Sequence, residues 1–449
     1  MGWRPSRYAV VGTTAFRHPS GRVVRPVLNT ATARVYLVDL DTAARLARER
    51  EPLTEDAARD RGLVEAGLLV EAGRDEAAEV IAAGRTAARD GRSRDFVVMP
   101  SAYCNMACAY CGQGHERFAL ARGHRSALTE RVRTAARSGR YDALNVRWFG
   151  GEPLMAYAVL RELSRSFIAS AGEAGVRYSA KVVTNGVLLD ARKLTALHRE
   201  CGVGLIEVTV DGPAEAHDAS RRLKSGGRSF HRILAVIAAA LEDPEVADLS
   251  FLVRTNVGVH NAGLAEPLAA ELAAAGLAHE RVTCYPAPVH PWGNDVTEMA
   301  LQRGTMAAVE LDWFRAYRRH GLRFPLLPGA PRRVVCAAVT RHSEVVAPDG
   351  RVFSCTEQPL VPGLGTGDLG HVSALDAASP RPAGAFDDWY DAMAAGETPC
   401  RGCPILPVCG GACPKLWREG SVPCPSLREN VRERLDLYAT SAGYIPVLS

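Results

Sequence analysis

The sequence lacks any run of about 18 consecutive apolar residues, the length that a helix needs to cross a bilayer. The opening residues Met1–Ser6 lack the apolar core of a secretory signal. No block of Lys or Arg is present either, and the net charge is only +4 with both signs mixed throughout. These absences argue against a membrane protein and against nucleic-acid binding. We therefore expect a cytoplasmic protein.

What the chain has instead is cysteine. Its 449 residues suffice for two or three domains, but it contains twelve cysteines. In the cytoplasm so many thiols are not expected to form disulfides, and metal or cluster ligation accounts for them better. Three lie within residues 104–111, Cys201 and Cys284 are isolated, and seven fall in the last quarter. This asymmetry predicts separate domains with separate clusters.

The first cysteine group has the spacing C-x3-C-x2-C, formed by Cys104, Cys108 and Cys111, and it follows an apolar run at 96–99. Three thiolates on one short loop can hold three irons of a cubane [4Fe–4S] cluster. The fourth iron then has no protein ligand, so a substrate or cofactor can occupy it. The alternative is a zinc site, which needs four ligands, and His115 is the nearest fourth candidate.

This cysteine run resembles the cluster motif of the radical S-adenosylmethionine (SAM) enzymes, including the aromatic Tyr110 before the third cysteine. The resemblance implies that the open iron binds the amino and carboxylate groups of SAM. It also implies that SAM is cleaved to a 5′-deoxyadenosyl radical that abstracts a hydrogen atom. Cys104, Cys108 and Cys111 would be the catalytic cluster ligands, and Tyr110 would pack on the adenine.

Residues 93–325 alternate between strand-like runs and Ala/Leu-rich segments of helical length, which predicts parallel βα units. The strand-like runs are 96–99, 145–149, 181–184, 205–210, 251–255 and 281–284. Six units are too few for an eight-stranded barrel, and they fit the open (β/α)6 partial barrel of the radical SAM family. Sites in such folds lie at the carboxyl ends of the strands, where the first cysteine loop also falls.

Two short motifs follow the second and third of these strands. Gly150-Gly151-Glu152 resembles the GGE motif of the family, which holds the SAM amino group, and small glycines let a backbone approach a ligand closely. A carboxylate such as Glu152 accepts hydrogen bonds from an ammonium group. Thr184-Asn185 begins a TNG sequence that many family members carry at this place. The resemblance makes all five residues candidate SAM contacts.

The fourth strand ends with Thr209 before Asp211-Gly212-Pro213, and Arg221 follows twelve residues after Thr209. In family members that mature proteins and peptides, a hydroxyl residue and an arginine at these places contact SAM. A hydroxyl suits a ribose or a carboxylate, and a guanidinium forks onto a carboxylate. The alternative for Arg221 is a solvated arginine beside Arg222.

The C-terminal cysteines form a second signature, C-x13-G-x4-C followed by C-x2-C-x5-C-x3-C and a final cysteine. This pattern resembles the SPASM domain, which carries two auxiliary iron–sulfur clusters. By position, the distal cluster would be held by Cys400, Cys403, Cys409 and Cys424. The proximal cluster would be held by Cys336, Cys355 and Cys413, one cysteine short of the usual set. An open site, a non-cysteine ligand or a distant ligand would complete it; Cys284 is more simply read as a buried core thiol.

Residues 1–92 read as short strands and helices. The strand-like runs are 8–11, 35–38 and 68–70, and helix N-caps are predicted at Asp41-Thr42 and Thr54-Glu55, with the second helix ending near Gly67. This order resembles a winged helix-turn-helix, which in peptide-modifying radical SAM enzymes binds the leader of the substrate peptide. A plain N-terminal cap on the barrel is the alternative.

The expected fold is therefore α/β. It comprises a small α+β, winged-helix-like domain (1–92), a radical SAM partial barrel (93–325) and a loop-rich iron–sulfur SPASM domain (326–449). The resemblance implies an enzyme with SAM and three [4Fe–4S] clusters. Its partners would be a precursor peptide with a leader and a reductant such as a flavodoxin or ferredoxin. It would install a thioether, C–C or ether cross-link, or a related modification, in a ribosomally made peptide.

Other functions stay open. One is a SPASM dehydrogenase or oxidase that acts on a small molecule or, like a sulfatase maturase, on a protein side chain. Thr356-Glu357 stands where those maturases carry an Asp after the cysteine corresponding to Cys355, which weighs against that role. An epimerase would need a cysteine hydrogen donor, for which Cys284 is a candidate. A non-catalytic cluster or zinc protein is the last alternative. The loop 285–294 either lines the substrate pocket or links two domains.

Overall fold

A computed structural model describes residues 2–48, 57–363 and 367–447, and the chain divides into two compact units. The first unit combines Met1–Ala88, Pro325–Val339 and Asp388–Ser449, and the second combines Arg89–Phe324 and Thr340–Asp387. Two of the unit boundaries lie within a few residues of the predicted domain boundaries. The division into three domains stays a prediction.

The second unit is built on one eight-stranded sheet with the order β14-β13-β11-β10-β9-β7-β15-β16. All neighbouring strands are parallel except β15 and β16, which are antiparallel. Their bounds are β7 Ser93–Val98, β9 Ala143–Trp148, β10 Arg177–Thr184, β11 Val203–Thr209, β13 Ser250–Val257, β14 Val282–Pro288, β15 Ser343–Val346 and β16 Val352–Phe353. The six predicted parallel strands are thereby confirmed.

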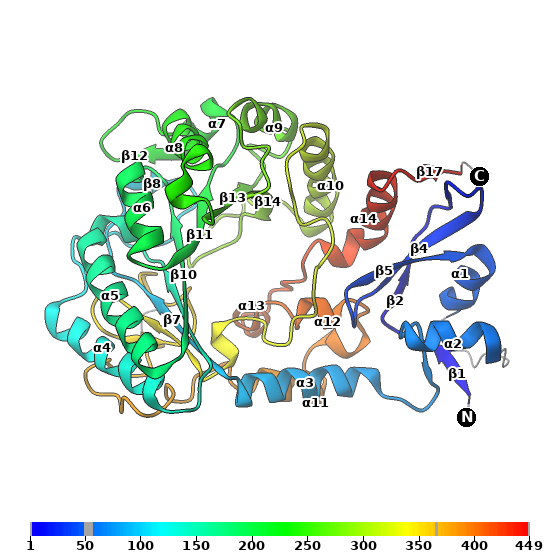
Figure 1. The fold of residues 1–449 in the computed structure, drawn as a ribbon, viewed down its shortest axis with the longest axis horizontal. Helices are drawn as coiled ribbons and strands as arrows, with labels where there is room; N and C mark the ends of the chain where they lie inside the picture. Colours follow the sequence, from blue (N-terminus) through cyan, green and yellow to red (C-terminus); the bar gives the residue numbers. More distant parts are fainter. Residues whose placement is uncertain (1, 49–56, 364–366, 448–449) are drawn as a thin grey trace. The chain divides into compact units, whose positions relative to one another are not determined.

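Helices lie along the outer side of this curved sheet (Figure 1). They are α4 Arg122–Arg137, α5 Tyr157–Ala174, α6 Ala191–Arg199, α7 Ala214–Ser220, α8 Phe230–Glu242, α9 Ala265–Ala274 and α10 Arg303–Arg319, with short 3-10 turns at Pro153–Ala156, Pro244–Val246 and Ala337–Val339. In α8 the buried residues Phe230, Ile233, Leu234, Ile237 and Leu241 recur at helical spacing and form one apolar stripe. Within the described ranges, no helix has the length and apolar composition of a membrane span.

The sequence did not predict that residues after 340 would extend the barrel sheet. Strand β15 pairs in parallel with β7, and Val345 and Phe353 join Val97 and Met99 in one buried cluster. An ion triad sits beside this cluster: Glu344, which is fully buried, accepts hydrogen bonds from Arg94 and Arg131. The expectation of a loop-rich segment from 326 onward is therefore corrected for this stretch, because its apolar and paired side chains can complete a sheet edge.

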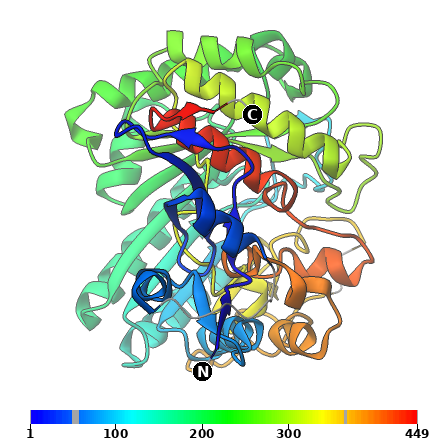
Figure 2. The same ribbon diagram turned by 90° about the vertical axis from the view of Figure 1, so that its right-hand side faces the viewer.

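The first unit contains a five-stranded antiparallel sheet of β2, β3, β4, β5 and β17, a separate antiparallel pair of β1 and β6, and its own helices. The bounds are β1 Trp3–Pro5, β2 Ala9–Val11, β3 Phe16–Arg17, β4 Val23–Asn29, β5 Arg34–Asp39, β6 Leu69–Glu71, β17 Ile445–Pro446, α1 Leu40–Ala47, α2 Ala57–Glu65, α3 Glu76–Asp90, α11 Trp389–Ala395, α12 Leu406–Cys409, α13 Pro414–Arg418 and α14 Leu427–Ser441, with a 3-10 turn at Pro399–Gly402. Figure 2 shows α14 beside the N-terminal strands. Val10 and Leu28 share a buried core with Ile405, Val408 and Leu435, so the N-terminal segment packs on the cysteine-rich segment.

Of the elements predicted for residues 1–92, the strands are confirmed and the start of the first helix is corrected. Strands over 9–11, 34–39 and 69–71 are confirmed, but the first helix begins two residues earlier than predicted. Its N-cap is Asp39, whose carboxylate accepts a hydrogen bond from the Thr42 backbone N–H. The predicted cap at Thr54-Glu55 lies outside the described residues. The winged-helix assignment stays a prediction.

Candidate functional site

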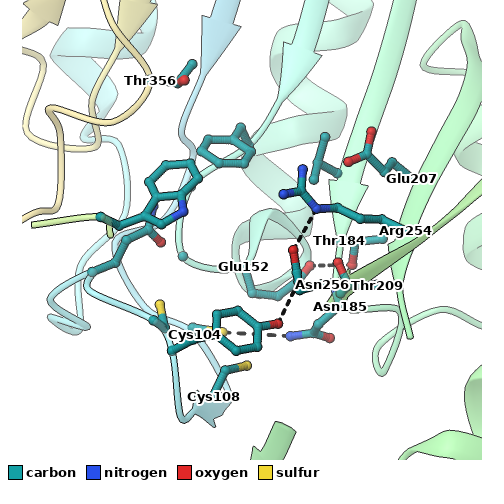
Figure 3. A pocket seen from close by; sticks show the side chains of 18 of the residues that line it. Cys104, Cys108, Glu152, Thr184, Asn185, Glu207, Thr209, Arg254, Asn256 and Thr356 are labelled. Atoms are coloured by element: carbon teal, nitrogen blue, oxygen red, sulfur yellow. Dashed lines mark hydrogen bonds between the residues drawn. The ribbon is translucent and has the colours of Figure 1, made fainter. Parts of the chain in front are cut away.

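A cavity of about 420 Å³ opens at the carboxyl ends of the second unit's parallel strands. Every candidate SAM contact and first-motif cysteine lines it, which confirms that the fold brings them together. They are Cys104, Cys108, Tyr110, Cys111, Gly150, Gly151, Glu152, Thr184, Asn185, Thr209 and Arg221. Figure 3 shows several of these side chains converging from neighbouring strands.

The cysteine loop is held by a two-stranded ribbon, in which β8 (Met106–Cys108) pairs antiparallel with β12 (Arg221–Leu223). This pairing places Cys108 opposite Arg221. The Met106 backbone N–H and the Asn185 side-chain amide both donate to Cys104 Sγ, at 3.4 and 3.8 Å. Burial raises the pKa of the Cys104 thiol to about 12. A metal that binds here must displace the thiol proton, and N–H···S bonds of this kind tune a cluster's potential.

Gly150 and Gly151 allow the loop after β9 to approach the cysteine loop. A Cβ at Gly150 would lie 2.9 Å from the Ser101 carbonyl oxygen, and one at Gly151 would lie 2.8 Å from the Tyr103 carbonyl oxygen. Gly150 also has φ +123°, which L side chains rarely adopt. The motif was expected to let the backbone approach a ligand. In this structure the close neighbour is the backbone that carries the cysteines.

Glu152 is 1% exposed, and its carboxylate organises the next strand end. It accepts hydrogen bonds from Thr184 Oγ1 at 2.7 Å and from the backbone N–H groups of Asn185 and Leu154 at 2.8 and 3.0 Å. Burial raises the pKa of this carboxyl, although the hydrogen bonds work in the opposite direction. An ionised carboxylate offers about four acceptor positions, so about one stays open toward the cavity.

The hydroxyl of Tyr110 is the centre of a polar network. It donates to Asp211 Oδ2 at 2.5 Å, accepts from Asn256 Nδ2 at 2.8 Å and accepts a short hydrogen bond from Arg221. Arg221 also forms an ion pair with Asp211 at 3.3 Å. Arg221 is therefore a buried, fixed cation rather than a solvated side chain. Its Nε atom is buried and has no hydrogen-bond partner among the described residues.

Asn256, Arg254 and Asp211 are site residues that the sequence reasoning missed as such. Asn256 bonds to Tyr110, and its backbone N–H donates to Asp211 Oδ1 at 2.7 Å. Arg254 lines the cavity and donates to Asn256 Oδ1 at 2.8 Å. A signal was available, because Asn256 directly follows the predicted fifth strand and each earlier strand end had supplied a polar candidate.

Deeper in the barrel, Lys181 and Glu207 form an ion pair at 2.5 Å, and the Tyr285 hydroxyl donates to Glu207 at 2.9 Å. All three line the cavity. Burial raises the pKa of Glu207, but the charge and hydrogen bond of Lys181, the Arg254 charge and the Tyr285 hydrogen bond together hold the pKa below its ordinary value. The wall opposite the cysteines is therefore polar and fixed.

The loop 285–294 reaches the cavity, as the pocket hypothesis requires. His290 and Trp292 line the cavity and stack with ring centroids 5.2 Å apart. Asn294 Nδ2 donates to the Tyr110 carbonyl oxygen at 3.1 Å, which ties this loop to the cysteine loop. Cys284 is fully buried and does not line the cavity. A role as a core thiol therefore fits Cys284 better than a role as a hydrogen donor.

The seven C-terminal cysteines fall in both units. Cys400, Cys403, Cys409 and Cys424 line a single pocket in the first unit, where Arg428 donates to Cys424 Sγ at 3.1 Å. Cys336 and Cys413 also belong to the first unit, and Cys355 belongs to the second. In the part of the chain that the structure describes, no three His, Cys, Asp or Glu side chains are grouped to hold a single metal ion.

Comparisons with known proteins found one matching sequence family and several solved structures of similar fold. Residues 98–255 match the sequence model of the radical SAM superfamily. The solved structure "native anSMEcpe with bound AdoMet and Cp18Cys peptide" aligns with a TM-score of 0.58 and 16% identity, over 78% of this chain and 97% of that one. Streptococcus suis SuiB bound to S-adenosylmethionine aligns with a TM-score of 0.46 and 12% identity, over 94% and 98% of the chains. No curated protein matches the sequence.

Proposed function

We propose that this chain, a radical SAM enzyme by its matched domain and its fold, uses SAM and three [4Fe–4S] clusters to modify a ribosomally made precursor peptide. The observation that carries the proposal is the convergence of three cysteines, a buried glutamate and a buried arginine in one cavity. When bound, the SAM-binding cluster would supply reductive cleavage of SAM to a radical that abstracts a hydrogen atom.

The residues present fit SAM. The cavity volume of about 420 Å³ lies in the range of cofactor sites. Glu152 would accept from the ammonium group with its remaining acceptor position. Arg221 would donate to the carboxylate, and its buried Nε atom without a partner is the donor that such a ligand satisfies. Tyr110, Asp211 and Asn256 would hold the guanidinium in place. Gly150, Gly151, Thr184, Asn185 and Thr209 would form the rest of the binding wall.

Cys104, Cys108 and Cys111 would hold the SAM-binding cluster. The pocket of Cys400, Cys403, Cys409 and Cys424 supports four-thiolate ligation of a distal auxiliary cluster. Cys336, Cys355 and Cys413 would hold the proximal one, which an open site, a non-cysteine ligand or a distant ligand would complete. A low-potential reductant such as a flavodoxin or ferredoxin would supply electrons.

Two observations support a peptide as the substrate. The similarly folded anSMEcpe structure contains a peptide by its description. In the first unit, β5 pairs only with β4 among the described residues, so its outer edge can accept a leader by strand addition. The residues 1–92 would then serve as the leader-binding region, and the cavity wall of His290, Trp292 and Tyr285 would position the modified residue.

One observation favours a second candidate, the oxidation of a peptide side chain without cross-linking. Thr356 replaces the expected Asp, but Glu357 lies on the cavity wall with a carboxylate oxygen 3.8 Å from His290 Nε2. A carboxylate at this place can take the proton that an oxidised substrate releases. The two candidates therefore share the same site.

The experiment is anaerobic incubation of the reconstituted protein with SAM, dithionite and a candidate precursor peptide sought among the neighbouring genes, followed by tandem mass spectrometry. A cross-link removes two hydrogen atoms and joins two residues in the fragment spectra. Side-chain oxidation removes two hydrogens from a single residue. A peptide that returns unchanged while SAM is cleaved would contradict the peptide-maturation proposal.

A further inference from the structure

The outer surface of the cysteine loop, away from the cavity, is covered by small and basic residues. Ala107 and Ala109 flank Cys108 on both sides and are exposed. Each contributes only a methyl group, so little protein separates the Cys108 backbone from solvent at this point. The rate of electron tunnelling falls steeply with distance. A carrier protein bound at this surface would therefore lie close to the cysteines, which favours electron transfer.

Basic side chains surround these alanines. Arg117 and Lys224 are exposed and lie over the Tyr103 ring, at 5.0 and 4.6 Å from its centroid. Tyr103 directly precedes Cys104. Arg222 is exposed on β12 and pairs in register with Ala107. Side chains alternate between the two faces of a strand. Arg222 and Lys224 are both exposed, and Leu223 between them is half-buried.

Acidic residues are scarce in the two segments that form this surface. The stretch 103–117 has Glu116 as its only acid, and 221–229 has three exposed basic residues besides the buried Arg221, and no acid. Lys224 is additionally tied to the loop, because its backbone N–H donates to the Asn105 carbonyl oxygen at 2.9 Å and its Nζ lies 3.0 Å from His115 Nδ1. Arg222 and Lys224 are thus held by the same ribbon that holds the cysteines.

We propose that Arg117, Arg222 and Lys224, around the exposed alanines, form the docking surface for an acidic one-electron carrier protein, a flavodoxin or ferredoxin. This inference rests on the proposed function, since it takes Cys104, Cys108 and Cys111 as ligands of the SAM-cleaving cluster. The basic patch steers the acidic carrier and orients its cofactor toward Cys108. In each encounter the carrier would pass one electron to the cluster that Cys104, Cys108 and Cys111 would hold. Such complexes are small and salt-sensitive, which suits a patch of three cations.

The test compares two electron sources for SAM cleavage. In the variant Arg117→Glu/Arg222→Glu, the initial rate of 5′-deoxyadenosine formation driven by an acidic flavodoxin, with its reductase and NADPH, falls about tenfold or more at low ionic strength. The difference shrinks as salt is added. The dithionite-driven rate stays near that of the wild type, because a small reductant needs no docking surface.

A matched control carries Arg177→Glu/Arg192→Glu, which reverses two exposed arginines at the starts of β10 and α6 and leaves the flavodoxin-driven rate unchanged. A second readout is direct: binding of oxidised flavodoxin to the immobilised protein, measured by biolayer interferometry, weakens in the first variant and not in the control.

Several results would overturn the proposal while the radical SAM assignment stands. One is a wild-type flavodoxin-driven rate in Arg117→Glu/Arg222→Glu. Another is an equal loss with dithionite, which would mean that the patch supports the cluster loop. A third is a wild-type protein that cleaves SAM with dithionite but accepts electrons from neither an acidic flavodoxin nor an acidic ferredoxin. If the wild type cleaves no SAM even with dithionite, the proposed function itself fails, and the docking proposal fails with it.

Discussion

At the scale of single residues, the site depends on buried polar groups that fix one another. The Tyr110 hydroxyl joins Asp211, Arg221 and Asn256, which come from three different loops or strand ends. Burial of such groups is costly unless each finds a partner, and here almost all do. Arg221 is therefore oriented before any ligand arrives, which lowers the entropic cost of binding.

The variant Tyr110→Phe removes the hydroxyl and leaves the Asp211 and Asn256 groups each short of a partner. We expect SAM affinity to fall about tenfold, since a lost buried hydrogen bond costs about 1–2 kcal/mol. Anaerobic equilibrium dialysis with labelled SAM measures this, and iron content is expected to stay at the wild-type level. Tyr438→Phe, at a 40% exposed side chain of α14, is the control and leaves affinity unchanged. Wild-type affinity in Tyr110→Phe would show that the network does not position Arg221.

At the scale of elements, β15 illustrates how a late segment completes an early sheet. Its Glu344 pairs with Arg94 of β7 and Arg131 of α4, at 2.7 and 2.6 Å. Burial raises the pKa of Glu344, but the charges and hydrogen bonds of the two arginines together hold the pKa below its ordinary value. This triad ties residues after 340 to the first barrel strand.

Glu344→Gln leaves two buried guanidinium groups without a counter-charge. Breaking a buried ion pair in this way typically costs about 3–5 kcal/mol, so the urea midpoint of the barrel unit is expected to fall well below that of the wild type. Circular dichroism under anaerobic conditions follows the transition. The control Glu162→Gln removes a half-exposed partner of Arg125 and is expected to cost less than about 1 kcal/mol. Equal midpoints for Glu344→Gln and the wild type would mean that the triad contributes no net stability.

The barrel strands were predictable from the sequence because apolar runs and polar strand ends are local signals. The SAM-site candidates likewise followed local motifs, and the fold brings all of them to one cavity. Features that depend on residues far away in the sequence were not predictable. Strand β15 needs β7 to complete its pairing, and Asn256 becomes a site residue only because Tyr110 lies across the cavity. The helix start at Asp39 was missed for a smaller reason, since Asp39 and Asp41 are both plausible caps and only geometry decides.

At the scale of the whole molecule, the chain distributes its cysteines over two compact units. The N-terminal strands contribute Val10 and Leu28 to the core that also holds Ile405 and Val408, next to the four-cysteine pocket. Removing the N-terminal segment would therefore open this core as well as remove the proposed leader-binding region. Point variants of the cysteines test the cluster assignments more cleanly than deletions do.

The variant Cys400→Ala/Cys403→Ala removes two ligands of the proposed distal cluster. Reconstituted wild-type protein is expected to hold roughly 11–12 irons per chain, and this variant roughly four fewer. SAM cleavage with dithionite is expected to persist, because the cavity of the second unit is intact. Iron is measured colorimetrically against protein concentration, with Cys201→Ala/Cys284→Ala as a control at two buried thiols. Unchanged iron content in Cys400→Ala/Cys403→Ala would remove the distal cluster from the assignment.

The central claim is that Cys104, Cys108 and Cys111 hold a cluster that cleaves SAM in the barrel cavity. The most direct measurement is 5′-deoxyadenosine formation by the reconstituted protein with SAM and dithionite, quantified by liquid chromatography. We predict turnover by the wild type and by Cys201→Ala/Cys284→Ala, and none by Cys104→Ala/Cys108→Ala/Cys111→Ala. Continued formation of 5′-deoxyadenosine by the triple variant would contradict the account.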